Sequence, residues 1–510
     1  MEETKFSGIF FRYEVLYRLE SCIPVKVGRP YVLDKNQKNS ILNITDLRRK
    51  LAFNPSSWAP ERGFRMSDII AAVSTPTGQG GVAIIRISGD GALSIAERIF
   101  RPTGRVPVRD FEPYRMYPGR IDPDGCGDYG LCVFFRAPHS FTGEDTVELH
   151  CHGGTALTRA VLQAALDAGC RTAERGEYTK RAFLNGKLSL SGAEGLGDLI
   201  AAESDAEIRA AGMLYGERLT EEAKRSQDDL KELLAEIDAD IDFPEEEIER
   251  SETAEWKKKT ADIRRRISAL MSTYGTGRKI SGGVHVVLAG RPNTGKSSLL
   301  NALLGERRAI VSAQAGTTRD SLDGATEIGG VRFVLYDTAG VRDSADEIES
   351  EGVARAKKLI EGADLVLCVL DGSCPLTEED RAFLALTENR PRILVFNKAD
   401  LPVRAGGVVP DITLSAKTGD GLEELRGRIF SAAMEGYNPD ALFITKRRHY
   451  EALLETEKLL EEAERDFGVL PPDLCGVPLR EAWNFLGRIT GETAGEKIID
   501  EIFEKFCLGK

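Results

Sequence analysis

The sequence has no run of apolar residues that approaches the roughly 18 needed to span a membrane. Its nine cysteines include no C-x-x-C pair, so neither a zinc ribbon nor a disulfide framework is indicated. Free thiols in a reducing cytosol are the simplest interpretation, and we expect a cytoplasmic protein without a membrane partner. The acidic Glu2 and Glu3 also argue against a signal or transit peptide.

The chain is poor in positive charge. It has 68 Lys and Arg residues against 81 Asp and Glu residues, a net charge of −13. This balance excludes a general nucleic-acid-binding protein, although a local basic site is still compatible with it. A hydrophobic fraction of 42% is typical of a soluble globular protein, and 510 residues predict about three domains.

Five segments differ in pattern. Residues 1–65 show no sustained period, so we expect a disordered N-terminal extension or a start assigned too far upstream. Strands and amphipathic helices predict an α+β domain over 66–184. Helical spacing marks 185–282 and 441–510, whereas 283–440 alternates strands and helices as an α/β domain with a parallel sheet does. The simplest topology inserts this α/β unit into a helical domain whose two halves pack together.

The most specific motif follows the apolar strand "VHVV". The pattern Gly290-x4-Gly295-Lys296-Ser297 lies between that strand and a helical run, as in a P-loop. Backbone N–H groups around 293–298 would bind phosphates at the start of a helix. Lys296 would neutralise the β- and γ-phosphate oxygens, and the Ser297 hydroxyl would bind Mg²⁺.

Four further motifs follow in the order of a GTPase. Ala315–Asp320 would be the first switch, with Thr318 as a second Mg²⁺ ligand, and Asp337–Gly340 would meet Mg²⁺ and the γ-phosphate. Asn397–Asp400 ends in a carboxylate that can accept both guanine N–H donors, a pair that adenine lacks. Ser415–Lys417 would reach the guanine carbonyl. The motifs together predict a Ras-like P-loop GTPase domain.

The predicted GTP-binding residues are therefore Asn293, Thr294, Gly295, Lys296, Ser297, Ser298, Ser312, Gln314, Gly316, Thr317, Thr318, Asp337, Thr338, Ala339, Gly340, Asn397, Lys398, Asp400, Ser415, Ala416 and Lys417.

Two departures from a Ras-like enzyme concern the catalytic step. Val341 stands where Ras-type enzymes carry the glutamine that orients water. The residues alone do not choose a substitute among the carboxylates that follow, which are Asp343, Asp346, Glu347, Glu349 and Glu351. Asn293 in the P-loop offers an amide oxygen that can bind a monovalent cation, which would supply the positive charge of an arginine finger. The alternative is a loop asparagine without a role in catalysis.

Outside these motifs stand "GQGGVAIIRISG", "SFTGEDTVELHCHGG", "RAFLNGKLSL", "IDFPEEE" and a terminal "CLGK". Over Met66–Lys510 the chain resembles the MnmE (TrmE) family of bacterial tRNA-modification GTPases. The resemblance implies a homodimer, formed through the N-terminal domains, that joins FAD-containing MnmG in a heterotetramer. It also implies addition of a carboxymethylaminomethyl-type group to C5 of the wobble uridine of certain tRNAs, with a tetrahydrofolate derivative as one-carbon donor.

The resemblance also implies site residues. The water-orienting carboxylate corresponds to Glu349, and the first domain would bind folate. The implied K⁺ ligands are Asn293, Ser312, Gln314 and Thr317. The implied folate ligands are Arg86, Glu148, Lys187 and Lys510. Without the resemblance, each of the last four would be interpreted as a surface or capping charge. Glu148, His150 and His152 share one strand face, which fits either a metal site or a wall of the folate pocket.

The C-terminal tail, Cys507-Leu-Gly-Lys510, formally fits a prenylation motif, but Gly509 is not aliphatic and Lys510 is a poor last residue. A simple buried thiol leaves the closing Gly-Lys unexplained. In the family this tail lies near the folate site, and its cysteine is tied to the modification chemistry. We therefore expect Cys507 to be a catalytic residue, with its role open.

An alternative function is a ribosome-assembly GTPase of the Era or Der type, which would share the nucleotide motifs. Such a factor needs an RNA-binding module such as a KH domain, and the sequence shows no G-x-x-G loop with basic flanks. For tRNA, the candidate basic surfaces are 257–259, 264–266 and 447–448, with solvated helix faces as the alternative interpretation.

Overall fold

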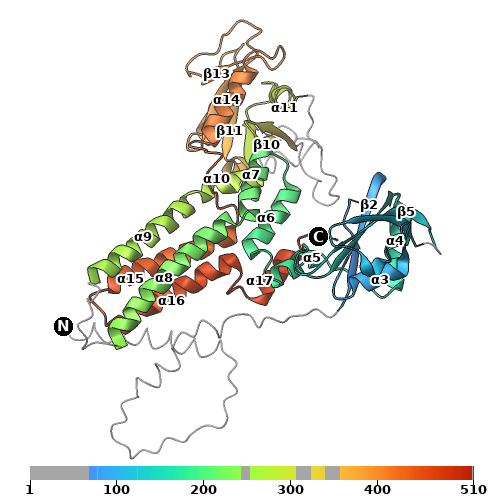
Figure 1. The fold of residues 1–510 in the computed structure, drawn as a ribbon. Coiled ribbons are helices and arrows are strands. Elements are labelled where there is room, and N and C mark those ends of the chain that lie inside the picture. Colours follow the sequence, from blue (N-terminus) through green and yellow to red (C-terminus); the bar gives the residue numbers. More distant parts are fainter. Residues whose placement is uncertain are drawn as a thin grey trace, which may run out of the picture. The chain divides into compact units, whose positions relative to one another are not determined.

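The computed structural model describes residues 68–76, 78–122, 125–242, 253–305, 323–338, 357–507 and 509. The chain divides between Arg65 and Met66 into two units, and the described residues all belong to the second. The expectation for residues 1–65 lies outside the described part. None of the described helices is both long and apolar enough to cross a bilayer. The predicted fold class is confirmed: an α+β domain precedes a helical domain that is interrupted by an α/β domain (Figure 1).

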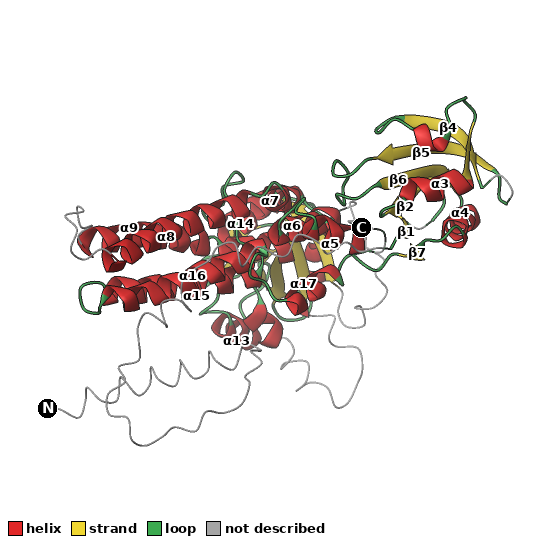
Figure 2. Cartoon of the chain, turned by 60° about the horizontal axis from the view of Figure 1, so that its bottom comes forward, coloured by secondary structure: helices red, strands yellow, loops and turns green. Residues whose placement is uncertain are grey.

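The α+β domain is built on a seven-stranded sheet in the order β3-β4-β5-β6-β2-β1-β7. Its strands are β1 (Ile70–Val73), β2 (Gly80–Ser88), β3 (Phe100–Pro102), β4 (Met116–Ile121), β5 (Asp128–Phe135), β6 (Thr146–Gly153) and β7 (Arg171–Thr172). Its helices are α3 (Ala92–Ile99), the 3₁₀ turn η3 (Val108–Asp110), α4 (Thr155–Asp167) and α5 (Glu177–Leu184). Helices α3 and α4 pack on the sheet (Figure 2).

Strand alternation points successive residues of β2 to opposite faces of this sheet. Ile85 and Ile87 in β2 belong to the buried core beneath α3 and α4. Arg86, between them, must therefore point to the opposite face. The antiparallel register pairs Arg86 with Glu148 of β6 and places His150 two residues further along the same strand. The local fold thus brings the predicted folate residues Arg86 and Glu148 side by side.

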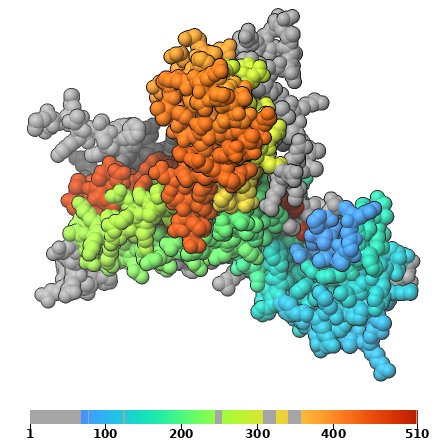
Figure 3. Space-filling model, turned by 90° about the horizontal axis from the view of Figure 1, so that it is seen from above, coloured from blue at the N-terminus to red at the C-terminus, as the bar shows by residue number. Residues whose placement is uncertain are grey.

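The helical domain is formed by two separate stretches of chain. The first contains α6 (Leu190–Ala201), α7 (Asp205–Tyr215), α8 (Arg218–Asp242), α9 (Thr253–Ser272) and α10 (Tyr274–Gly282). The second contains α15 (Arg447–Asp466), α16 (Pro472–Thr490) and α17 (Glu496–Phe503). Helix α8 packs against α16, and α9 packs against α15. The red and light-green surfaces of these segments adjoin in Figure 3.

The helical spacing seen over 185–282 corresponds in α8 to a buried apolar side. Leu230, Leu233 and Ile237 are fully buried in one cluster with residues of α16. The last described helix, α17, ends at Phe503. Phe506 lies beyond that end and is nevertheless buried, where it approaches Gly197 of α6.

The α/β domain has a six-stranded sheet in the order β13-β12-β11-β8-β10-β9. Its strands are β8 (Val284–Ala289), β9 (Asp323–Ile328), β10 (Val331–Asp337), β11 (Leu365–Asp371), β12 (Arg392–Asn397) and β13 (Ile412–Thr413). Its described helices are α11 (Lys296–Leu304), α13 (Glu378–Leu386) and α14 (Leu422–Ala433). Strand β9 pairs antiparallel and the other described pairs are parallel, so the carboxyl ends of β8, β10, β11 and β12 meet at one edge.

Helices α7 and α10 join the two domains. Ala206 and Ala210 of α7 and Ile280 of α10 belong to the same buried cluster as the residues of β8 and β10. In α10, Gly277 passes so close to Ile444 that an added Cβ would clash with the carbonyl oxygen of that residue. Gly275, in the same helix, has open space in the corresponding direction.

These two glycines give a matched pair of variants. Gly277→Ala is expected to lower the free energy of unfolding by about 1–3 kcal/mol, because the extra carbon overpacks the contact between α10 and the segment before α15. Gly275→Ala is expected to raise it by up to about 1 kcal/mol, because alanine is the better helix former. Urea unfolding followed by tryptophan fluorescence reports the helical domain, which contains Trp256 and Trp483. Equal urea midpoints for the two variants would contradict the close contact between Gly277 and Ile444.

Candidate functional site

The P-loop residues form a tight turn between β8 and α11. Gly290 lies against Val369 of β11, where a Cβ would clash with the carbonyl oxygen. Asn293 (φ 64°) and Gly295 (φ 93°) adopt the left-handed conformation. Lys296 begins α11, and its Nζ donates hydrogen bonds to the carbonyl oxygens of Gly290 (2.8 Å) and Arg291 (2.9 Å). The loop therefore ends at a helix N-terminus, which attracts phosphate. The ammonium group of Lys296 lies against the carbonyl oxygens of the same loop.

Ser297 and Asp337 are brought together by neighbouring parallel strands. The Ser297 hydroxyl donates a 2.7 Å hydrogen bond to Oδ2 of Asp337, which is buried at the carboxyl end of β10. A hydroxyl and a carboxylate oxygen are the hard ligands that Mg²⁺ prefers. Two residues predicted for the magnesium site from separate motifs thus lie within contact distance. The other predicted Mg²⁺ ligand, Thr318, lies outside the described residues.

Asn397 connects the P-loop to the predicted guanine-binding segments. Its Nδ2 donates to the Thr294 carbonyl oxygen (2.9 Å), and its Oδ1 accepts from the Ala416 backbone N–H (2.9 Å). Ser415 donates from Oγ to Oδ1 of Asp400 (2.8 Å). The carboxylate predicted to bind guanine is therefore held by the next motif along the chain.

Sequence reasoning missed Asp371, which anchors Lys398. Lys398 has φ 68° and donates to Asp371 Oδ2 at 2.6 Å, while Ser373 donates to Oδ1. Burial alone would raise the pKa of Asp371, but the hydrogen bonds from Lys398 and Ser373 lower it to about 2. The available signal was an aspartate that closes the fully buried strand "LVLCVLD".

The remaining predicted residues of the nucleotide site divide into two groups. The described ones are Ser298 and Lys417, which are exposed, and Thr338, whose hydroxyl donates to the Leu288 carbonyl oxygen (2.9 Å) and so secures the end of a strand. The other group lies outside the described residues: Ser312, Gln314, Gly316, Thr317, Thr318, Ala339, Gly340 and Glu349.

A second cluster lies on the polar face of the first sheet. Arg86 Nη2 is 2.8 Å from Oε1 of Glu148, and His150 Nε2 is 3.3 Å from Oε2. The Arg86 guanidinium lies 5.8 Å from the ring centroid of Phe141 and 5.7 Å from that of Tyr178. Burial would raise the pKa of Glu148, but the hydrogen bond from His150 and the Arg86 guanidinium hold it below its ordinary value.

The metal interpretation of the β6 residues is not supported. Both oxygens of Glu148 are engaged, by Arg86 and His150, and His152 instead contacts Asp128 with a distance of 2.7 Å between Nδ1 and Oδ1. Within the described ranges, no group of three His, Cys, Asp or Glu residues is placed to hold a metal ion. Glu148 and His150 instead form a polar wall with Arg86.

The C-terminal tail reaches this domain from the far end of the chain. The Gly176 N–H donates to the Cys507 carbonyl oxygen (3.4 Å), and Ser74 Oγ donates to the Gly509 carbonyl oxygen (3.2 Å). Gly509 (φ 89°) lies so close to Val73 at the end of β1 that a side chain would clash. The tail thus lies beside α5 and β1 (Figures 1 and 2), and Cys507 itself is exposed.

The other two predicted folate residues are less informative. Lys187 donates from Nζ to the Pro138 carbonyl oxygen at 3.0 Å, in the loop between β5 and β6. Lys510 lies outside the described residues.

The basic segments considered for tRNA carry many ion pairs with neighbouring helices. Lys259 pairs with Glu236 of α8, and Arg264 pairs with Glu464 of α15. The other pairs are Lys259 with Glu255, Arg265 with Asp262, Arg266 with Asp229, Arg447 with Glu451 and Arg448 with Glu194, several of them within one helix. These contacts fit the alternative interpretation as helix faces, and a role of these segments in tRNA binding stays a prediction.

Known proteins match this chain along nearly its whole described length. The family model of the MnmE helical domain matches residues 190–507, and that of the GTP-binding protein TrmE N-terminus matches 69–187. The tRNA modification GTPase MnmE of Heliobacterium modesticaldum is 40% identical over 465 residues, which cover 87% of this chain and 100% of that protein. The MnmE of Symbiobacterium thermophilum is 42% identical over 455 residues, covering 87% and 99%. This chain belongs to the MnmE family.

Membership in the MnmE family confirms the resemblance found in the sequence. The protein is a GTP hydrolase of the tRNA-modification class and uses a guanine nucleotide with Mg²⁺. The Era- or Der-type alternative is not favoured, because the match includes the α+β domain and both halves of the helical domain.

Asn397 gives a direct test of the nucleotide site. Asn397→Ala would remove both of its hydrogen bonds and leave the Thr294 carbonyl and the Ala416 N–H without that partner. We expect the affinity for GDP to fall by about tenfold or more, as loss of a buried hydrogen-bonded group costs about 1–3 kcal/mol. Asn438→Ala, in an exposed turn, is the control and should bind GDP normally. Titration with a fluorescent GDP analogue measures both, and equal affinities would contradict the bridging role.

The low pKa of Asp371 predicts a pH dependence of stability. A carboxyl group whose folded-state pKa lies below its ordinary value of 3.8 stabilises the fold above that value. The stabilisation is lost as the pH falls toward about 2. Asp371→Asn should therefore lower the urea midpoint at pH 6, and the difference from wild type should shrink as the pH is lowered below 4. Asp420→Asn, an exposed carboxylate in the same domain, serves as the control. A difference that stays constant with pH would contradict the Lys398 pair.

Proposed function

We propose that this protein is a K⁺-activated GTP hydrolase that acts with FAD-containing MnmG on tRNA. Together they would add a carboxymethylaminomethyl-type group to C5 of the wobble uridine, from a tetrahydrofolate one-carbon unit. The observation that carries this proposal is the course of the C-terminal tail. Cys507 is 421 positions after Arg86 in the sequence, yet its segment is bonded to α5 and β1 of the domain that contains Arg86.

In the nucleotide site, the chain supplies charge and orientation for phosphoryl transfer. The N–H groups at the start of α11 would bind the β-phosphate, and Lys296 would exchange its bonds to loop carbonyls for phosphate oxygens. Ser297 and Asp337 would hold Mg²⁺, directly and through water. Asn397 and Asp400 would fix the base, so that the phosphates stand at a set distance from the magnesium ligands.

The potassium site is proposed from Asn293 and the family pattern. Asn293 lies in the P-loop in the left-handed conformation, which turns the loop at this residue. Its amide oxygen, with oxygens from 312, 314 and 317, would hold K⁺ beside the phosphates. The ion would supply the positive charge that other GTPases obtain from an arginine finger. Glu349 would orient the attacking water in place of the missing glutamine.

In the first domain, Glu148 would accept hydrogen bonds from the N–H groups of a pterin. The residues fit this role, because Arg86 keeps the carboxylate ionised and the rings of Phe141 and Tyr178 line the same cluster. Lys187 and Lys510 would bind the carboxylates of the glutamyl portion. The bound folate would supply the one-carbon unit, and the exposed thiol of Cys507 would lie near it.

We also propose that the α+β domain forms the homodimer contact. Large apolar side chains of its strands are exposed, namely Val82, Met116 and Tyr129. Large exposed apolar side chains are typical of surfaces that contact another protein.

GTP hydrolysis by the purified protein should be much faster in KCl than in NaCl at matched ionic strength. Na⁺ is smaller than K⁺ and would be bound poorly by oxygens spaced for K⁺. Glu349→Ala should abolish most of the K⁺-stimulated rate by removing the group that orients water, an effect of about 10²–10⁴-fold for a positioned acid–base residue. Glu347→Ala is the control and should retain the stimulation. Equal rates in the two salts would overturn the K⁺ proposal, and full activity of Glu349→Ala would overturn the role of Glu349.

A further inference from the structure

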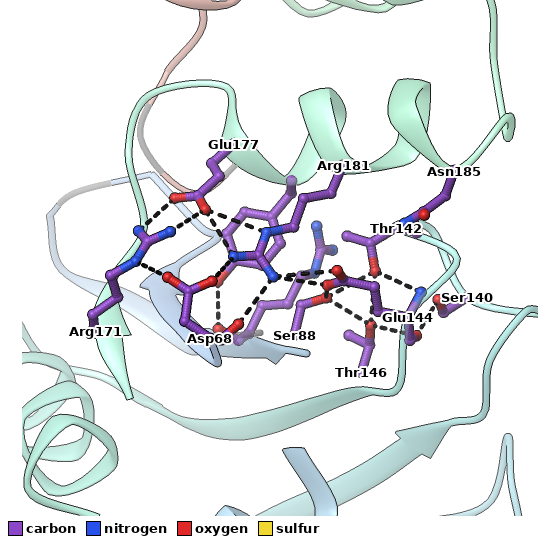
Figure 4. A network of polar contacts seen from close by, with 12 residues as sticks. Asp68, Ser88, Ser140, Thr142, Glu144, Thr146, Arg171, Glu177, Arg181 and Asn185 are labelled. Atoms are coloured by element: carbon purple, nitrogen blue, oxygen red, sulfur yellow. Dashed lines mark hydrogen bonds and ion pairs between the residues drawn. The ribbon is translucent and has the colours of Figure 1, made fainter. Parts of the chain in front are cut away.

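Helix α5 contacts both the sheet that carries Arg86 and Glu148 and the C-terminal segment that carries Cys507. The proposed function needs these two parts together. Glu177, Arg181 and Asn185 follow one another at intervals of four and therefore share one side of the helix. Figure 4 shows this side facing Asp68, before β1, and the segment that contains Thr142. Asn185 donates to the Thr142 carbonyl oxygen at 2.8 Å.

Arg181 is the centre of the contacts on that side. Its side chain is 1% exposed, and its guanidinium contacts three carboxylates. The distances are 2.9 Å to Asp68, 2.9 Å to Glu177 and 3.0 Å to Glu144. Its Nη1 also donates to the Asp68 backbone carbonyl at 3.1 Å. A second cation, Arg171, contacts Asp68 and Glu177.

Arg181 supplies one of the two positive charges of this network. Three carboxylates meet two guanidinium groups, so the cluster has a net charge of −1 even with Arg181 present. Removal of Arg181 would leave three carboxylates with Arg171 alone, and Glu177 (3% exposed) and Glu144 (16% exposed) are largely buried, where unpaired charge is costly. Because Glu177 is on α5 and Glu144 precedes β6, their repulsion would act between the helix and the sheet.

The same network is joined to the strand of the proposed folate site. Ser88, two residues after Arg86, donates from Oγ to Oε2 of Glu144 at 2.9 Å. Tyr178 of α5 donates from its hydroxyl to the Arg86 carbonyl oxygen at 2.7 Å. The position of Arg86 is therefore coupled to the position of α5 by two hydrogen-bonded routes.

Other residues of the α5 segment contact the C-terminal segment. Gly176 (φ 64°) donates to the Cys507 carbonyl oxygen and lies so close to Phe503 that a side chain would clash with its carbonyl oxygen. Lys180 pairs with Asp500 at 2.6 Å, and the ring centroids of Phe183 and Phe503 are 6.1 Å apart.

We propose that Arg181 is a positioning residue for the modification reaction. By fixing α5 against the sheet, it determines where the Cys507 tail lies relative to Arg86 and Glu148. The catalytic significance rests on the proposed function, whereas the positioning can be measured without tRNA.

Hydrogen exchange with mass spectrometry on the full chain tests the positioning. In Arg181→Met, amides of residues 173–186 and of 500–509 should both exchange at least about tenfold faster, since removing one partner of a buried ion pair is strongly destabilising. Peptides of the nucleotide-binding domain should be unchanged. Arg181→Lys keeps the positive charge but lacks the planar guanidinium that contacts several carboxylates at once. It should give a smaller increase in the exchange rate of the same two segments.

Lys180→Met is the matched control, because it removes the Asp500 pair and leaves the Arg181 contacts. It should speed exchange in 500–509 and leave 173–186 protected. Faster exchange of 173–186 with an unchanged tail in the Arg181 variants would overturn the proposal. Faster exchange throughout the chain in both Arg181 variants would also overturn it, because Arg181 would then stabilise the whole fold.

Activity separates this inference from the proposed function. With MnmG, a folate donor and tRNA, Arg181→Lys should lower kcat for modification while the KM for tRNA and the rate of GTP hydrolysis stay at wild-type values. Absence of modification by the wild-type protein would refute the proposed function. The hydrogen-exchange result would still test whether Arg181 positions α5 and the C-terminal tail. Loss of GTP hydrolysis in Arg181→Lys would contradict a positioning role.

Discussion

The parallel pairing of β8 with β10 and β11 is the constraint on which the nucleotide site depends. It places the carboxyl ends of these strands and of β12 at one edge, so that motifs far apart in the sequence become neighbours. The hydrogen bond from Ser297 to Asp337 and the bridge that Asn397 makes to Thr294 follow from this alignment. Gly290 is required for the same reason, because the loop must pass against the carbonyl of Val369.

Much of this site was predictable because each motif carries its own structural context. A P-loop is recognised by a strand before it and a helix after it, and both lie within 20 residues of Lys296. Asp371 was missed because its role depends on a contact with Lys398, 27 positions away, that no local pattern encodes. Arg181 was missed for the same reason: in the sequence it is one more charge on an amphipathic helix, and its partners Asp68 and Glu144 are distant.

The basic segments show how tertiary contacts change the interpretation of a local charge pattern. Arg264 lies in a run of three arginines that indicates a site for phosphate. The partner that neutralises it, Glu464, is 200 positions away on α15. Helical spacing predicted the buried face of α8 well, since apolar burial needs no specific partner, whereas the partner of a charge has to be known before its effect on the surface is known.

The region between the two sites is also connected by ion pairs. Helix α6 follows α5 directly, and its Glu194 contacts Arg448 and His449, which hold the pKa of that buried carboxyl low despite its burial. Glu203, just after α6, pairs with Arg332 at the start of β10.

Strand β10 ends at Asp337, so packed elements connect the Arg181 network, through α5, α6 and α7, to the carboxylate predicted to bind magnesium. At the junction, a cavity of about 230 Å³ lies between α7, α10 and β10. Close-packed interiors transmit displacement and resist gradual deformation, so a cavity is where two elements have room to change their relative position. Glu203 and Arg332, the pair that connects the end of α6 to β10, both line that cavity, so a change in the position of either element would act on this junction.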